Sequence, residues 1–334
     1  AHPRRNADPE LSNSFSFRLL CYGFCSKCKA LIHSIEKTTG KDVIIHMTDF
    51  KNAEELLELC GHRQQPISEI MKQRECDLAE VPMTQVHERM ALALEIMRQS
   101  ASAPLRSPVR SMGGLIGGQA RLLHGRLESN SAVCGSVLTR GIIYAMAVLE
   151  VNASMGVIVA APTAGSSGIV PGLLLSLQET YAFSDEQMIN SLFNAGAIGY
   201  LAMRNATVAG AVGGCQAEAG VAAAMAASAA VELMGGTPQQ SLDAASTVLI
   251  NMLGLVCDPV GGLVEYPCQN RNAAGVANAL TAAEIALAGI RQMISFDEML
   301  DTMYHVGKRI PYELRETALG GCAATPSGCK FCHT

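Results

Sequence analysis

Apolar residues recur with helical spacing along most of the chain. Within 84–100, Val86, Met90, Leu94 and Met97 lie three or four positions apart, which places them on one face of an amphipathic helix. Towards the N-terminus the apolar segments are shorter and their helical spacing is less regular. The further segments in which we expect helices are 15–35, 52–60 and a helix beginning at 67–72.

From about residue 131 to residue 294, apolar segments alternate with Gly-rich turns, whereas β-branched runs with a period of two are scarce. We therefore expect a mostly α-helical main domain with Gly-rich loops, preceded by a short mixed N-terminal region with a strand at 42–47. Pro104, Pro108 and two Gly-Gly pairs predict a loop over 100–118. The expected division is an N-terminal extension (1–50), a main domain (51–328) and a Cys-containing tail (329–334).

Composition narrows the class of protein. Apolar residues make up 49% of the chain and charged residues 16%, and the net charge of −5 comes without a Lys/Arg block, so we expect no nucleic-acid partner. The N-terminus lacks the apolar core of a signal peptide. The apolar segment 219–235 is Ala-rich and contains Glu232, which favours a buried helix over a membrane span. Twelve cysteines in a chain of this length do not resemble the disulfide framework of a small secreted domain, and we expect a cytoplasmic protein.

The richest candidate chemistry lies in the segment 257–272, CDPVGGLVEYPCQNRN, together with Cys215 in GGCQAEAG. Cys257 and Cys268 stand at turns marked by Pro and Gly, among polar residues that suit a ligand. Three thiolates without an obvious fourth suggest a [4Fe–4S] cluster, which four cysteines normally hold. Its open iron would then act as a Lewis acid. From the residues alone, three buried cysteines packed as small apolar side chains are the alternative.

Several motifs, taken in order, resemble those of the iron–sulfur-dependent L-serine dehydratases, in particular their α chain or α domain. The resemblance covers roughly residues 50 to 328 and implies a helical domain whose [4Fe–4S] cluster is held by Cys215, Cys257 and Cys268. It also implies dehydration of L-serine to an enamine that becomes pyruvate and ammonia. The motifs are VNASMG at 151–156, APTAGSSGIVPG at 161–172, GGCQAE at 213–218, the segment 257–272, LRETALGG at 314–321 and AATPSG at 323–328.

The TAGSSG loop is the first candidate substrate site. Thr163, Gly165, Ser166 and Ser167 stand where a loop opens a helix, so that free backbone N–H groups and hydroxyls can receive a carboxylate. The pattern alone also fits an ordinary helix cap. The resemblance implies that this loop lines the active site, although the family often has Cys at the position of Ser167.

Arg271 and Asn272 are the second candidate, just beyond Cys268. A guanidinium at this position either clamps a substrate carboxylate or neutralises the cluster thiolates, and the sequence does not separate the two roles. Asp258 and Glu265, between two of the cysteines, are candidate bases, although turn capping is favoured for Asp258.

The general base is not evident. Between His87 and His305 the sequence has a single histidine, His124, which is the candidate within this chain. In split members of the family the α chain works with a separate β chain, which can complete the site. No lysine occurs between Lys72 and Lys308, and this argues against pyridoxal phosphate, which needs a Schiff-base lysine.

The remaining cysteines leave alternatives open. Some relatives place a C-terminal cysteine on the cluster, which implies that Cys329 or Cys332 is a fourth ligand and that the tail is a plug displaced by substrate; a mobile, reduced tail is the alternative. Cys21, Cys25 and Cys28 have the spacing of radical S-adenosylmethionine enzymes. The chain that follows does not fit the β/α barrel of those enzymes, so we favour a chance cluster or an incidental metal site.

The resemblance thus predicts an oligomeric lyase that acts on L-serine. Desulfuration of L-cysteine would use the same chemistry with a thiol leaving group. A cluster-bearing sensor or electron carrier is an alternative from another class. Electron carriers, however, gain from a cluster that is buried and fully held by cysteines. The polar TAGSSG loop favours a substrate site.

Overall fold

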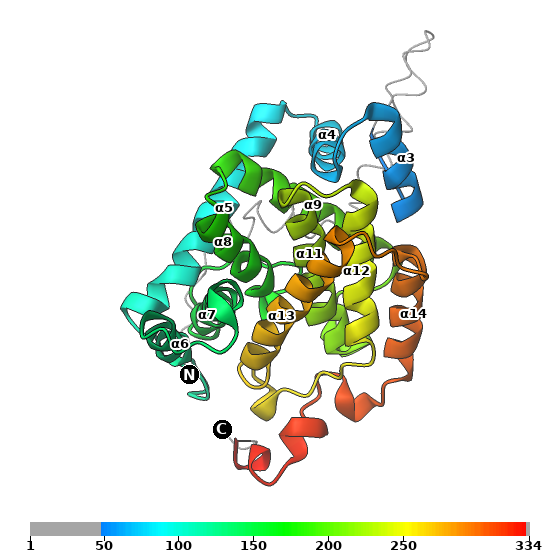
Figure 1. Cartoon of the computed structure of the whole chain (residues 1–334). Coiled ribbons are helices and arrows are strands. Elements are labelled where there is room, and N and C mark those ends of the chain that lie inside the picture. The colour runs from blue at the N-terminus through cyan, green and yellow to red at the C-terminus, as the bar shows by residue number, and fades with distance from the viewer. Residues whose placement is uncertain (1–47, 332–334) are drawn as a thin grey trace, which may run out of the picture.

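The computed structural model describes residues 48–331. Helices surround a central helix, α11, which contacts α8, α9, α12 and α13 (Figure 1). Within the described residues the only β pairing is an isolated parallel bridge between Cys257 and Arg315. The expected mostly α-helical fold is therefore confirmed. The α-helices are α3 (Ala53–Arg63), α4 (Ile67–Ala79), α5 (Met83–Arg106), α6 (Gln119–Glu128), α7 (Gly135–Ala153), α8 (Ile169–Tyr181), α9 (Asp185–Asn205), α10 (Gly210–Gly213), α11 (Val221–Leu233), α12 (Pro238–Met252), α13 (Cys268–Leu287) and α14 (Phe296–Arg309).

The central helix is buried because it is made of small apolar side chains on every face. Its sequence, VAAAMAASAAVEL, lets the neighbouring helices approach closely, and a helix that is apolar all round belongs in a core. The carboxylate of Glu232 accepts hydrogen bonds from the side chain of Asn194 at 2.7 Å and the backbone N–H of Ser68 at 3.2 Å. These contacts satisfy a polar group that burial would otherwise leave unpaired. The prediction of a buried helix over 219–235 is confirmed.

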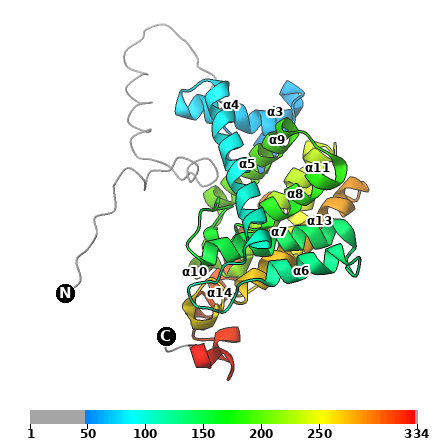
Figure 2. The ribbon, with the colours of Figure 1, turned by 90° about the vertical axis from the view of Figure 1, so that its left-hand side faces the viewer.

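The long helix α5 runs alongside this core (Figure 2). All four residues of the predicted apolar face, from Val86 to Met97, are buried. The predicted loop over 100–118 is wrong at its start, because the helix continues to Arg106 with Pro104 in its last turn. A proline forgoes one helical hydrogen bond. The side chain of Pro104 is itself buried, and the backbone N–H of Ser107 closes the turn on the carbonyl of Ala103.

The first described helices begin where the sequence predicts. Asn52 caps α3 by accepting a hydrogen bond from the backbone N–H of Glu55 at 2.7 Å, and α4 begins at Ile67. The helix expected at 15–35, the strand at 42–47, the cysteines Cys21, Cys25 and Cys28, and Cys332 lie outside the described residues.

Of the described helices, α7 alone combines the length and apolar composition of a membrane span, and half of that stretch is buried in the protein. A core helix of a water-soluble protein has the same properties, so this helix is no argument for a membrane.

The chain beyond α14 folds against one end of the bundle, close to the start of α13 (Figure 1). Its backbone pairs with that of Cys257: the Cys257 N–H donates to the carbonyl of Leu314 at 2.8 Å, and the Glu316 N–H donates to the carbonyl of Cys257 at 2.6 Å. This pairing places the C-terminal segment beside the predicted cluster ligands. The short turns in and around the site are η2 (Ala164–Ser166), the π-helical η3 (Gln216–Gly220), η4 (Val260–Gly262), η5 (Tyr312–Leu314), η6 (Gly321–Ala324) and η7 (Gly328–Phe331).

Candidate active site

Cys215 immediately precedes the π-helical turn η3, which continues directly into α11. Such turns are rare and are found often at functional sites. The side-chain amide of the next residue, Gln216, donates to the carbonyls of Gly213 and Met303, both at 2.9 Å, and accepts from the N–H of Gly254 at 2.8 Å. Gln216 therefore fixes the Cys215 turn against the chain that leads to Cys257.

Gly214 allows this close approach. Its φ of +77° lies in the region that favours glycine, and a Cβ here would come within 2.8 Å of the carbonyl oxygen of Leu255. A larger residue would push apart the segments that carry Cys215 and Cys257.

The three predicted ligand cysteines are buried and form no disulfide, and they lie close enough for their charges to interact. Burial, opposed by the nearby Arg271, raises the pKa of Cys215 to about 11. Burial and the neighbouring Cys215 thiol also raise the pKa of Cys268 to about 12, and the same two causes together with Glu218 raise the pKa of Cys257. Thiols in this setting become thiolates when metal cations bind them. The donor set therefore fits an iron–sulfur cluster held by three cysteines.

The Arg271 guanidinium has three partners in this site. It forms an ion pair of 2.6 Å with Asp258, donates to the carbonyl of Val256 at 2.9 Å, and hydrogen-bonds the Cys215 sulfur. These contacts favour the interpretation that Arg271 neutralises the thiolates; its predicted contact with substrate stays a prediction. Asp258 is a structural anchor as well, because its other oxygen accepts from the backbone N–H of Cys322 at 2.6 Å.

The predicted substrate loop packs against η3, which follows Cys215, and against α13, which begins with Cys268. The Thr163 and Ser166 hydroxyls are 3.1 Å apart, and the Ser167 hydroxyl donates to the carbonyl of Ala164 at 2.7 Å. Ser166 and Ser167 are fully buried, whereas Thr163 and Gly165 are partly exposed. The two serines therefore hold the loop in shape, and Thr163 and Gly165 face accessible space.

Asn272 fastens this loop to α13. Its side-chain amide donates to the carbonyl of Gly165 at 2.8 Å, and its side-chain oxygen accepts from the backbone N–H of Gly168 at 3.1 Å. The residue is 1% exposed. Because both ends of the amide are engaged, the structure gives Asn272 a positioning role; the predicted contact with substrate is not observed directly.

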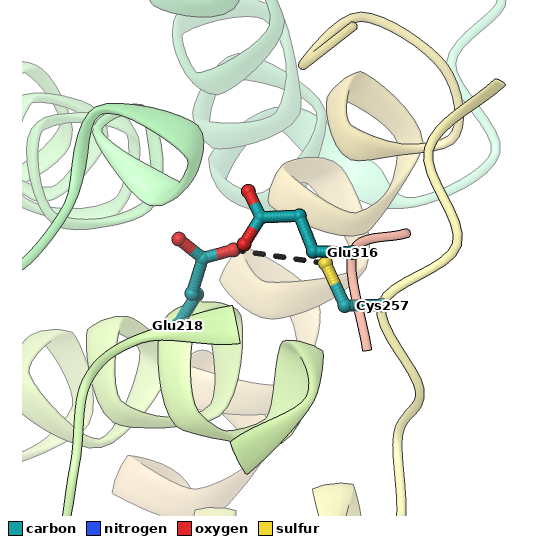
Figure 3. A group of neighbouring side chains, drawn as sticks. All are labelled: Glu218, Cys257 and Glu316. Atoms are coloured by element: carbon teal, nitrogen blue, oxygen red, sulfur yellow. Dashed lines mark hydrogen bonds between the residues drawn. The ribbon is translucent and has the colours of Figure 1, made fainter. Parts of the chain in front are cut away.

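Sequence reasoning missed two carboxylates in the site. The side chains of Glu218 and Glu316 point toward each other beside the sulfur of Cys257 (Figure 3), and the ligand atoms of all three lie within 4.8 Å of one another. Burial and the neighbouring Glu316 raise the pKa of Glu218 to about 7, and a hydrogen bond from Thr163 partly offsets this. Both glutamates stand in quoted motifs, GGCQAE and LRETALGG, which was the available signal.

Glu265 joins the Cys257–Cys268 segment to the Gly-rich loop before α6. Its carboxylate accepts from the Ser111 hydroxyl at 2.6 Å and from the backbone N–H groups of Gly113 and Leu115 at 2.6 and 2.9 Å. A carboxylate with three donors is a structural anchor. The proposed role of Glu265 as a base has no support in these contacts.

Two predicted site residues have partners elsewhere. His124 lies on α6 and pairs with Glu128 on the same helix at 3.3 Å. The Cys329 thiol faces the carbonyl of Ala323 at 3.6 Å, within the C-terminal turns. The turn that carries Cys329, η7, packs against η4, between Cys257 and Cys268. The roles of His124 as base and of Cys329 as fourth ligand stay predictions.

The chain belongs to the serine dehydratase alpha chain family, whose family model matches residues 62–323. This family consists of lyases, and the resemblance drawn from the sequence motifs is confirmed.

Individual relatives agree with this assignment. The chain is 47% identical to a probable L-serine dehydratase alpha chain of Bacillus subtilis, over 84% of this chain and 93% of the relative. It is 41% identical to the L-serine dehydratase alpha chain of Peptoniphilus asaccharolyticus, over 84% and 96%. An L-serine dehydratase of Helicobacter pylori is 36% identical over 96% of this chain but only 70% of its own length.

Proposed function

We propose that this chain is the α subunit of an L-serine dehydratase that converts L-serine to pyruvate and ammonia. The observation that carries the proposal is the convergence of three buried cysteines from separate segments beside the Thr163–Gly165 loop. The names of the relatives support the same substrate.

Cys215, Cys257 and Cys268 are the residues proposed to hold a [4Fe–4S] cluster, with Cys329 or Cys332 as a fourth ligand in the resting state. When bound, such a cluster supplies an open iron that polarises the substrate hydroxyl and carboxylate. Arg271 offsets the negative charge of the thiolates, and Asp258 holds the guanidinium in place. The chain therefore provides both the ligands and the charge balance that the cluster requires.

The loop residues orient the substrate. Partly exposed backbone at Gly165 and the Thr163 hydroxyl can receive the carboxylate, while Asn272 keeps the loop at a fixed distance from Cys268. Removal of the Cα proton requires a base. We propose that a separate β chain supplies it, with His124 as the candidate within this chain.

The lengths of the relatives support a separate partner. This chain spans nearly all of the two relatives named alpha chain but 70% of the Helicobacter pylori dehydratase. The extra length of that relative is the counterpart that a β chain would provide. We propose an oligomeric, cytoplasmic enzyme composed of both chains.

The test is to purify the chain without oxygen, measure its iron and visible spectrum, and assay pyruvate from L-serine with and without a β chain. We expect about four irons per chain and pyruvate release that requires the β chain or increases with it. Sulfide release from L-cysteine, assayed in parallel, measures the alternative substrate. No iron and no pyruvate after anaerobic reconstitution with the β chain would reject the proposal.

A further inference from the structure

The Glu218–Glu316 pair brings two carboxyl groups together in the site, and the cysteine chemistry does not explain them. Within residues 48–331, no salt bridge links a lysine or an arginine to either carboxylate. The guanidinium of Arg271, which belongs to the same site, is engaged by Asp258 and the Cys215 sulfur. The pair is therefore a site where a positively charged group of a ligand would be favoured.

L-serine carries one positive group, its α-ammonium. We infer that Glu218 and Glu316 bind this ammonium and so select an α-amino acid over a hydroxy acid of the same shape. The inference rests on the proposed function, because it takes L-serine as the ligand of the site. It assigns these glutamates a role in specificity, separate from the cysteines that hold the cluster and from the base.

The spacing of the carboxylates suits an ammonium. One nitrogen at about 2.8 Å from each of two oxygens can bridge oxygens up to roughly 5.6 Å apart. The facing oxygens of Glu218 and Glu316 are within 4.8 Å of each other. An ammonium has three donors, so it can bond to both carboxylates at once.

Two glycines keep the surroundings of Glu218 free of side chains. A Cβ on Gly210 would lie 2.8 Å from a Glu218 carboxylate oxygen and 3.1 Å from the Cys257 sulfur. A Cβ on Gly165 would lie 3.7 Å from both Glu218 oxygens. The Glu218 carboxylate thus lies between the sulfur of Cys257 and the loop proposed to receive the substrate carboxylate. An α-amino acid bound between the loop and Cys257 would present its nitrogen to Glu218.

The test compares L-serine with 3-hydroxypropionate, which has the same carboxylate and hydroxyl but no ammonium. Both are titrated into the anaerobic, cluster-loaded protein, and their dissociation constants are read from the visible spectrum, by rapid mixing in the case of L-serine. We expect the wild type to bind L-serine at least about tenfold more tightly. Glu218→Gln and Glu316→Gln should each reduce this preference by about tenfold or more, mainly by weakening L-serine, with iron content and helical circular dichroism unchanged.

Glu313→Gln, in the same C-terminal segment but exposed, is the matched control and should keep the wild-type preference. An unchanged preference in both variants would overturn the inference, as would equal binding of the two ligands by the wild type. Loss of iron in the Gln variants would also overturn it, because the carboxylates would then be metal ligands. A wild type that prefers L-serine yet releases no pyruvate with the β chain contradicts the proposed function and leaves the ammonium site standing.

Discussion

The side-chain amide of Asn272 bridges two backbone groups of the Gly-rich loop, the carbonyl of Gly165 and the N–H of Gly168. Asn272 lies one helical turn after Cys268, so the same residue relates the loop to a proposed cluster ligand. The distance between the substrate loop and the cysteines is thus set by one buried amide.

Asn272→Ala should lower both stability and activity. It leaves the buried N–H of Gly168 and the carbonyl of Gly165 without their partner, and each such group is destabilising by about 1–3 kcal/mol. We expect the free energy of unfolding of the metal-free protein to fall by about 2–4 kcal/mol in denaturant titrations. Asn278→Ala, later in the same helix, should change it by less than about 1 kcal/mol. Equal effects of the two substitutions would contradict the positioning role.

Glu265→Ala should release the Gly-rich loop before α6. The substitution removes the acceptor of three hydrogen bonds that hold Ser111, Gly113 and Leu115. We expect limited proteolysis to cut within 111–118 at least about tenfold faster, a change that corresponds to about 1.4 kcal/mol of local opening. Glu284→Ala, an exposed change on α13, should leave the cutting rate unaltered. A loop that stays protected in the Glu265 variant would show that other contacts hold it.

Cys257→Ser should remove the cluster without unfolding the chain. A serine hydroxyl is a poor iron ligand, whereas the backbone pairing of this residue with Leu314 and Glu316 does not depend on its side chain. We expect the visible absorption and the iron content of the anaerobic protein to fall to near zero, and activity to fall at least about a hundredfold. Cys60→Ser, a buried cysteine on α3, is the control and should retain both. An unchanged spectrum in the Cys257 variant would reject it as a ligand.

Glu75→Gln should flatten the pH dependence of stability. Burial, opposed by Arg74, raises the pKa of Glu75 from 4.5 to about 7, so the folded chain retains a proton that the unfolded chain has lost between these values. The free energy of unfolding therefore falls as pH rises from about 4.5 to about 7, by at most about 1.4 kcal/mol per pH unit for one proton. The variant, measured by denaturant titration of the metal-free protein, should lose this part of the slope. Glu54→Gln, an exposed change, should keep it, and an identical slope in all three proteins would contradict the shifted pKa.

The sequence predicted those parts of the fold and the site that depend on local patterns. The apolar face of α5 and the start of α3 follow from the spacing of apolar residues in the sequence. The end of α5 did not, because burial of Pro104 outweighs its unfavourable helix propensity. Glu218 and Glu316 were missed because their proximity depends on the pairing of the Cys257 backbone with a distant segment, which no local pattern encodes.

The bridge between Cys257 and Arg315 has a consequence for the order in which this protein matures. A chain leaves the ribosome from its N-terminus, so α11 and all three cysteines emerge before the segment that pairs with Cys257. During that interval the sulfur lacks both the backbone partner that fixes it and the Glu316 carboxylate beside it. Insertion of the proposed cluster into the finished geometry would therefore have to follow synthesis of the segment that carries Arg315 and Glu316.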